Sequence, residues 1–189
     1  MYKRQVPALK AGVDVSRLRR IEKDGAAPFL VLRCNGVRIF CRGGNWGMDD
    51  GMKRVSRERL EPAFRLHREE GFNMVRNWTG ESTEELFYTL CDEYGLLVWN
   101  DFWLSTEGYN QNVNDEELFM ANARETVRRF RNHPSLAVWC PRNEGYATPT
   151  LEPRLAALIA REDGTRFYSP NSRYMNCLLY TSPSPRDYA

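Results

Sequence analysis

The stretch Leu136-Ala-Val-Trp-Cys140, which leads into Pro-Arg-Asn-Glu144, decides the fold class because an uninterrupted apolar run ends in polar residues. Such a run is typical of a parallel strand that is buried on both faces. Leu96-Leu-Val-Trp99 has the same character and is followed by Asn100-Asp101. We therefore expect both segments to be strands of one parallel sheet.

Shorter runs on either side extend this pattern. Val37–Cys41 and Phe72–Val75 predict two earlier strands, and Phe167-Tyr168 predicts the start of a fifth. Between these runs, apolar residues at helical spacing predict helices over 56–70, 82–94, 114–133 and 151–162. Strict alternation of strand and helix favours right-handed crossovers and a parallel sheet, either a barrel or an open doubly wound sheet.

Capping signals predict where two of these helices begin. Ser82 and Glu85 have the spacing of a capping box, and Asn114 with Glu117 opens the next helix in the same way. Leu118 is expected on the inward face of that second helix. Gly95 is the expected stop of the first.

Each predicted strand leads into asparagine followed by an aromatic or acidic residue. The four pairs are Asn45-Trp46, Asn77-Trp78, Asn100-Asp101 and Asn143-Glu144. In a barrel the carboxyl ends of the strands share the face on which active sites are built. Amides and acids bind hydroxyls, and flat rings stack on sugars, so a carbohydrate site is predicted. Phosphate binding is the alternative, but Gly43-Gly44-x-x-Gly47 lacks the Lys-Ser/Thr of a P-loop.

Four stretches carry a family resemblance, in the family's order and spacing. They are Asn35 to Trp46, Gly71 to Trp78, Tyr94 to Phe102 and Arg131 to Glu144, the last containing Asn-His-Pro-Ser and Asn-Glu. Over about residues 30–175 the chain resembles glycoside hydrolase family 2. The Arg-x-Trp and Trp-Asn-Asp-Phe motifs look more like its β-mannosidase and endo-β-mannosidase branch. The resemblance implies a (β/α)8 TIM barrel, of which strands 1–4 and the start of strand 5 are present.

The resemblance gives two adjacent residues the central roles. Glu144 would be the general acid/base, a role that needs a carboxyl group with a raised pKa. Asn143 would hydrogen-bond the C2 hydroxyl of the sugar, a contact that strengthens in the transition state. The structural alternatives are an ordinary helix-capping carboxylate for Glu144 and a turn amide for Asn143.

Four further residues are candidates for substrate binding. By resemblance Arg76 lies beneath the nucleophile, and Trp78 forms a wall that stacks on the sugar. Asp101 would bind a hydroxyl or pair with Arg76, and Trp46 lies in a loop that borders the site. The alternatives are an ion pair for Arg76 and Asp101, core packing for Trp78, and a solvated loop for Trp46.

The resemblance also implies what the chain lacks. Retaining glycosidases need two carboxyl groups about 5 Å apart, and the family's nucleophile follows strand seven, downstream of this sequence. We expect the parent to be a retaining β-glycosidase acting on β-mannosides, and this polypeptide alone to show no turnover. β-Galactosidase or β-glucuronidase activity, or a non-catalytic carbohydrate-binding relative, stays open.

Both ends of the chain look foreign to a protein. Met1–Gln5 and residues 177–189 resemble translated stretches of a transposon-based sequencing adapter. We therefore divide the chain into an adapter scar (1–5), the end of a preceding β-sandwich domain or linker (6–34), the half barrel (35–176) and an adapter tail (177–189). The compartment of the parent stays open, with periplasm and secretion among the options.

Composition excludes several function classes. The net charge of +2, from 27 basic and 25 acidic residues, is too balanced for a nucleic-acid partner or a polybasic membrane protein. No apolar run approaches the roughly 18 residues of a membrane-spanning helix. The scattered cysteines and two histidines fit no metal-ligand pattern, so no metal or cofactor is expected, and the oligomeric state stays open.

Overall fold

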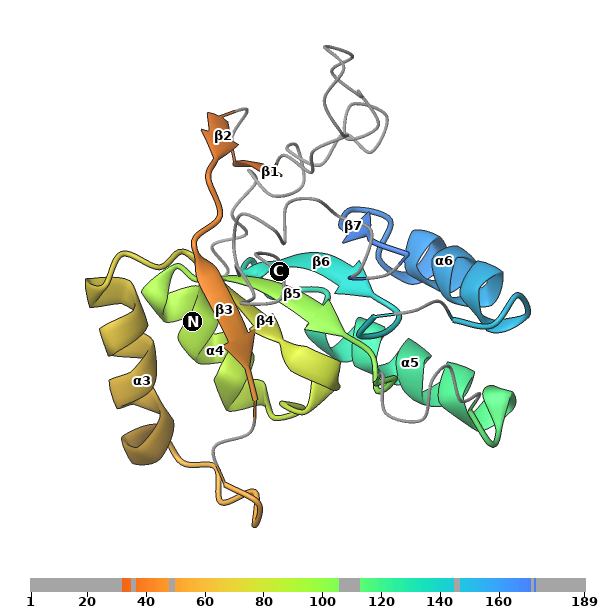
Figure 1. Cartoon of the computed structure of the whole chain (residues 1–189), viewed down its shortest axis with the longest axis horizontal. Coiled ribbons are helices and arrows are strands. Elements are labelled where there is room, and N and C mark those ends of the chain that lie inside the picture. The colour runs from red at the N-terminus through yellow and green to blue at the C-terminus, as the bar shows by residue number, and fades with distance from the viewer. Residues whose placement is uncertain are drawn as a thin grey trace, which may run out of the picture.

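The computed structural model describes residues 32–34, 37–47, 50–105, 113–144, 147–170 and 172. Five parallel strands form its sheet in chain order, β3-β4-β5-β6-β7 (Figure 1). Their bounds are β3 Gly43–Trp46, β4 Met74–Asn77, β5 Leu97–Asp101, β6 Leu136–Cys140 and β7 Phe167–Tyr168. The helices are α3 Arg57–Glu69, α4 Glu85–Tyr94, α5 Glu116–Phe130 and α6 Leu151–Glu162, and the 3-10 turn η1 spans Trp78–Gly80.

The strand order distinguishes a barrel from an open doubly wound sheet. A doubly wound sheet reverses its strand order at a switch point, whereas here each strand pairs in parallel with the next one along the chain. The four helices follow the outer side of the sheet in the same sequence (Figure 1). This is the arrangement of consecutive strand–helix units in a (β/α)8 barrel, so the predicted fold class is confirmed.

Strand alternation divides the apolar core between the two faces of the sheet. Val75, Val98 and Trp139 point outward and pack with the buried faces of the helices. Met74, Trp99 and Val138 belong to a separate inward cluster, together with Cys140 and Phe167. The continuous apolar run of β6 is therefore explained by burial on both sides, because all five of its residues are buried.

The first predicted strand forms, but its place in the parallel sheet was wrong. Val37–Ile39 forms β2, which pairs antiparallel with β1, Leu32–Cys34, and the first parallel strand is the glycine-rich β3. Gly43 is required there because a Cβ atom at this position would lie 1.9 Å from the Met74 carbonyl oxygen. Gly43 thus allows close pairing of β3 with β4, and Gly43 and Gly44 belong to a strand rather than to a loop that opens a helix. The Asn35-Gly36 dipeptide, typical of a two-residue hairpin, was the sequence signal for β1–β2.

The elements after β3 agree better with the bounds predicted from the sequence, except at the starts of α4 and α5. β6 and α6 have the predicted bounds, and Gly95 ends α4 with a φ of 67°. Ser82 does not cap α4, since its hydroxyl oxygen accepts from the Trp46 indole at 3.2 Å. Asp115, rather than Asn114, caps α5 by accepting from the Leu118 amide at 2.9 Å.

The apolar face of α5 also differs from the prediction. Leu118 is 59% exposed, whereas its neighbours Phe119 and Met120 are buried, because these two, and not Leu118, precede Ala123 by the three or four residues that place side chains on one helix face. Among the described helices, none combines the length and apolar character needed to cross a bilayer.

Candidate active site

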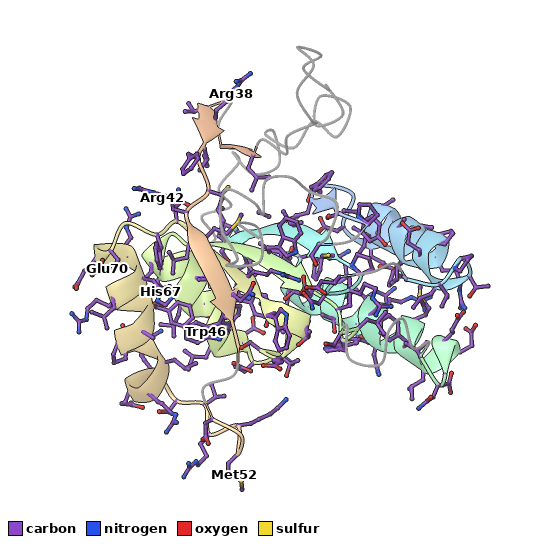
Figure 2. The ribbon with its side chains drawn as sticks, in the orientation of Figure 1. Arg38, Arg42, Trp46, Met52, His67 and Glu70 are labelled. Atoms are coloured by element: carbon purple, nitrogen blue, oxygen red, sulfur yellow. The ribbon has the colours of Figure 1, made fainter. Side chains whose placement is uncertain are left out.

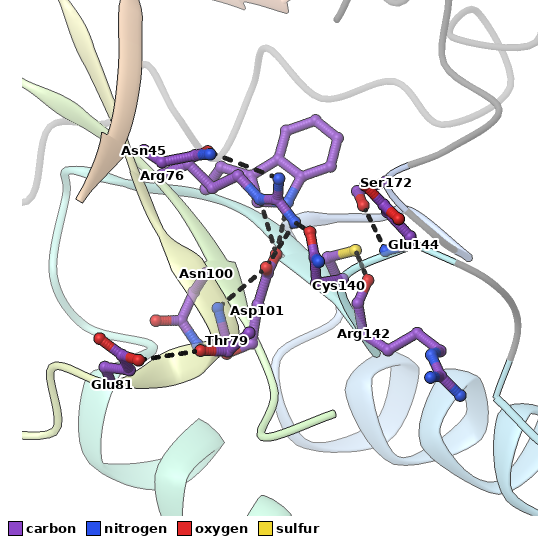
Figure 3. A network of polar contacts seen from close by, with 12 residues as sticks. Asn45, Arg76, Thr79, Glu81, Asn100, Asp101, Cys140, Arg142, Glu144 and Ser172 are labelled. Carbon is purple, nitrogen blue, oxygen red and sulfur yellow. Dashed lines mark hydrogen bonds and ion pairs between the residues drawn. The ribbon is translucent and has the colours of Figure 1, made fainter. Parts of the chain in front are cut away.

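Arg76 and Asp101 form a buried ion pair on the inward face of the sheet. Arg76 lies on β4 and Asp101 ends β5, and their side chains are 10% and 0% exposed. Nε and Nη2 of Arg76 donate to Oδ1 and Oδ2 of Asp101 at 3.2 and 2.6 Å (Figure 3). Two parallel bonds of this kind fix the guanidinium plane, so the predicted pairing of these two residues is confirmed.

Asp101 also accepts from two further donors. The Trp99 indole donates to Oδ1 at 3.0 Å, and the backbone N–H of Thr79 donates to Oδ2 at 3.1 Å. Burial raises the pKa of the Asp101 carboxyl group, although Arg76 and the other donors act in the opposite direction. This contact of Trp99 was not predicted, although its position two residues before Asp101 places both side chains on one strand face.

Asn143 joins this pair from the loop after β6. Nη2 of Arg76 donates to Oδ1 of Asn143 at 2.8 Å, and the backbone N–H of Asn143 donates to the Leu104 carbonyl oxygen at 2.8 Å. Asn143 is only 6% exposed. Residues of β4, of β5 and of the loop after β6 therefore meet at one guanidinium group.

Glu144 follows at the edge of the same cluster, and its side chain is exposed. Its backbone has a φ of 41°, a conformation that rarely suits a non-glycine residue, and its N–H donates to the Ser172 hydroxyl at 2.8 Å (Figure 3). Non-glycine residues with positive φ concentrate at functional sites. In the described chain the others are Thr79, beside Asp101, and Lys53.

Trp78 begins the η1 turn directly after β4 and is partly exposed. In the part of the chain that the structure describes, no ring–ring contact involves its indole, unlike those of Trp46, Trp103 and Trp139. Trp78 lies at the carboxyl end of β4, the end of the strands at which β/α barrels bind their ligands.

Trp46 is not in a loop, and that prediction was wrong. It is the last residue of β3, and its ring packs against Phe64 and Phe87 at centroid distances of 4.9 and 5.9 Å. Figure 2 shows it beside His67 of α3. Its neighbour Asn45 contacts Arg76 at 3.5 Å, so alternation turns the Trp46 ring toward the helices and away from the ion pair.

The side chains of Asn77 and Asn100 do not join the site that was predicted at the carboxyl ends of the strands. Asn77 donates to Oδ1 of Asn100 at 2.8 Å and to the Ser82 carbonyl oxygen at 2.8 Å, and the Tyr88 hydroxyl donates to the same Asn100 oxygen at 2.6 Å. All four residues are buried between the sheet and α4. We call them the outer amide cluster. Their geometry is that of a structural network, with each group paired inside the protein.

The described residues gather no set of three or more histidine, cysteine or acidic side chains that could hold a metal ion. Cys91 and Cys140 are buried free thiols, and Cys41 is partly buried. Burial raises the pKa of the Cys41 thiol to about 11, so it is protonated at neutral pH.

A chain-ordered parallel sheet with outer helices, and a polar cluster at the carboxyl ends of its strands, defines the class of β/α-barrel enzymes. Residues 30–178 match the family model described as "Glycosyl hydrolases family 2, TIM barrel domain". The chain therefore belongs to glycosyl hydrolase family 2.

Named relatives refine this comparison. Mannosylglycoprotein endo-β-mannosidase of Lilium longiflorum is 39% identical over 137 residues, covering 67% of this chain and 14% of the relative. Beta-mannosidase B of Thermothelomyces thermophilus is 40% identical over 114 residues, covering 59% and 13%. The crystal structure of β-D-mannosidase from Dictyoglomus thermophilum is 32% identical with a TM-score of 0.69, covering 78% of this chain and 20% of that one. The chain thus spans a fifth or less of these proteins.

Proposed function

We propose that this chain supplies the acid/base side of the active site of a retaining β-glycosidase that hydrolyses β-mannosides. The observation that carries the proposal is the cluster of Arg76, Asp101 and Asn143, with Glu144 directly beside it at the carboxyl ends of β4, β5 and β6. Glu144 protonates the glycosidic oxygen and later takes a proton from water. The nucleophile comes from outside the 189 residues.

The other side chains bind the sugar in this proposal. Asn143 hydrogen-bonds the C2 hydroxyl, and the partly exposed Trp78 ring stacks on the apolar face of the sugar. Arg76 has five N–H groups, and its contacts with Asp101, Asn143 and Asn45 engage four of them. The fifth can hold the incoming nucleophile ionised. Trp46 is left out, because its ring faces the helices.

The comparisons support β-mannosides over other sugars. The relatives named above are β-mannosidases at 32–40% identity. A β-glucuronidase of Bacteroides uniformis is similar at 23% identity, with a TM-score of 0.63, a likeness of fold alone. The domain division, with adapter sequence at 1–5 and 177–189, remains part of the proposal.

The test is made on the enzyme encoded by the whole gene, recovered from DNA beyond the codon of Asn176. We expect it to prefer aryl β-mannosides over β-galactosides and β-glucuronides. In Glu144→Gln, hydrolysis of a poor leaving group falls by about 100- to 10,000-fold, as expected for loss of general acid/base catalysis. Substrates with very acidic leaving groups lose far less, because they need no proton at the first step.

Added azide should restore turnover of such activated substrates in Glu144→Gln and give a β-configured glycosyl azide. Full activity in that variant would refute the assigned role. Hydrolysis by the 189-residue chain alone, if abolished by Glu144→Gln, would refute the external nucleophile.

A further inference from the structure

The carboxylate of Asp101 is completely occupied by donors from this chain. Oδ1 accepts from Arg76 Nε and Trp99 Nε1, and Oδ2 accepts from Arg76 Nη2 and the Thr79 amide. A carboxylate offers about four lone-pair positions, so these four donors fill them. With no exposed surface on its side chain, Asp101 presents no oxygen to an entering sugar.

The same guanidinium group determines how Asn143 is oriented. Arginine only donates hydrogen bonds, so the amide end of Asn143 that faces Nη2 at 2.8 Å has to be the oxygen. The amide nitrogen then occupies the other branch of the side chain. Asn143 therefore meets a ligand as a hydrogen-bond donor.

We infer that Asp101 is a positioning residue, which does not touch the sugar but holds Arg76, and through Arg76 fixes the Asn143 amide as a donor to the oxygen at C2. The inference rests on the proposed function. It replaces the expectation that Asp101 binds a sugar hydroxyl. It also assigns Thr79 and Trp99 as residues that hold the Asp101 carboxylate in place.

Asp101→Asn is the sharpest perturbation, because each Asp101 oxygen receives two donors. Whichever way the new amide is turned, its NH2 group opposes two N–H groups, one of them from Arg76. Asp50 offers a matched control. Its carboxylate is also buried, and it accepts from the Arg54 side chain and from the backbone N–H groups of Met52 and Arg54, none of which belongs to the site.

Kinetics on the whole-gene enzyme separate positioning from direct binding. We expect Asp101→Asn to lower kcat/KM for an aryl β-mannoside by about 100-fold, mainly through kcat, as a misplaced contact to the transition state would. The loss should shrink to about tenfold or less on the 2-deoxy analogue, which lacks the oxygen that Asn143 contacts. Asp101→Asn should add little to Asn143→Ala in a double-mutant cycle. Asp50→Asn should retain the wild-type values.

The inference would be overturned by equal losses of kcat/KM on the aryl β-mannoside and its 2-deoxy analogue. It would also be overturned if the effects of Asp101→Asn and Asn143→Ala were additive in the double-mutant cycle. If Asp101→Asn does not fold by circular dichroism, Trp99→Phe replaces it. Phenylalanine remains apolar and aromatic but lacks the indole N–H that donates to Oδ1 of Asp101, so a smaller loss, again restricted to the C2 oxygen, is expected. A loss independent of that oxygen would count against the inference.

A measurement that needs no activity separates this inference from the proposed function. In the 189-residue chain, hydrogen exchange of a peptide covering Trp78–Glu81 should be at least about tenfold faster in Asp101→Asn, because the Thr79 amide loses its acceptor. The same peptide should be unchanged in Asp50→Asn. Unchanged exchange in Asp101→Asn would overturn the anchoring, whereas an inactive whole-gene enzyme with faster exchange would refute the proposed function alone.

Discussion

Neighbouring residues at the ends of β4 and β5 belong to two polar clusters with different surroundings. Arg76 and Asp101 point inward, where they reach Asn143 and leave Glu144 exposed beside them. Asn77 and Asn100 point outward into the outer amide cluster, where Ser82 and Tyr88 complete their hydrogen bonds. The inner cluster holds charge and lies next to an exposed carboxyl group, whereas the outer cluster is neutral and closed. A single step along a strand therefore separates the residues available for chemistry from those that hold the helix layer.

The largest stability effect is expected from breaking the outer amide cluster. Asn100→Leu leaves the Tyr88 hydroxyl without its acceptor and removes one partner of Asn77, at a cost of about 2–4 kcal/mol in the free energy of unfolding. Urea unfolding measures this. The matched control is Asn45→Ala, another strand-end asparagine, which is exposed and should change stability by less than about 0.5 kcal/mol. Equal effects of the two changes would remove the distinction between the clusters.

A smaller effect is expected where the inner cluster meets the η1 turn. Gly80 has a φ of 64°, and a Cβ atom there would lie 2.6 Å from the Asp101 carbonyl oxygen. Gly80→Ala should therefore cost about 1–3 kcal/mol in unfolding free energy, from backbone strain and from displacement of the turn.

Gly44→Ala is the control for this substitution, because a Cβ atom at Gly44 meets nothing within 4 Å. It should not destabilise the protein. If Gly80→Ala were equally silent in the same urea titration, the close packing of η1 against β5 would be wrong.

The smallest expected effect on stability comes from His133, whose ring centroid lies 5.4 Å from that of Tyr88. Burial acts to lower the pKa of His133, but its contacts with Asp92 at 2.7 Å and Glu85 at 2.8 Å outweigh burial, and the pKa is raised. Arg129, which pairs with Glu85, is the cation facing this group. A raised pKa in the folded state stabilises the protein fully below the ordinary histidine pKa of about 6.5, and this stabilisation is lost as pH rises through the folded-state value.

The difference in unfolding free energy between the wild type and His133→Gln should therefore be greater at about pH 6 than at about pH 9. Urea titrations at both values check this. A difference that grows toward high pH would mean that His133 is neutral in its contacts with Asp92 and Glu85.

Much of the fold follows from local pattern. The apolar run of β6, the helical spacing of α6 and the glycine that ends α4 each depend on neighbours in the chain, and their positions agree with the structure. The family resemblance of the stretch that ends in Asn143 and Glu144 likewise depends only on consecutive residues of the chain. By contrast, β3 has glycines that favour no strand, and it forms by pairing with β4, which approaches so closely at Met74 that only glycine fits at position 43.

The amino-acid sequence is enough to identify the polar residues at the strand ends and the family to which the chain belongs. Which of them share a site is not, because four asparagines in equivalent local sequences divide between two faces once strand register and helix packing are set. Asn45 and Asn143 contact Arg76, while Asn77 and Asn100 meet each other beneath α4. The physical reason is that a side chain's face depends on which residue begins the pairing of each strand, and the neighbouring strands and helices establish that pairing.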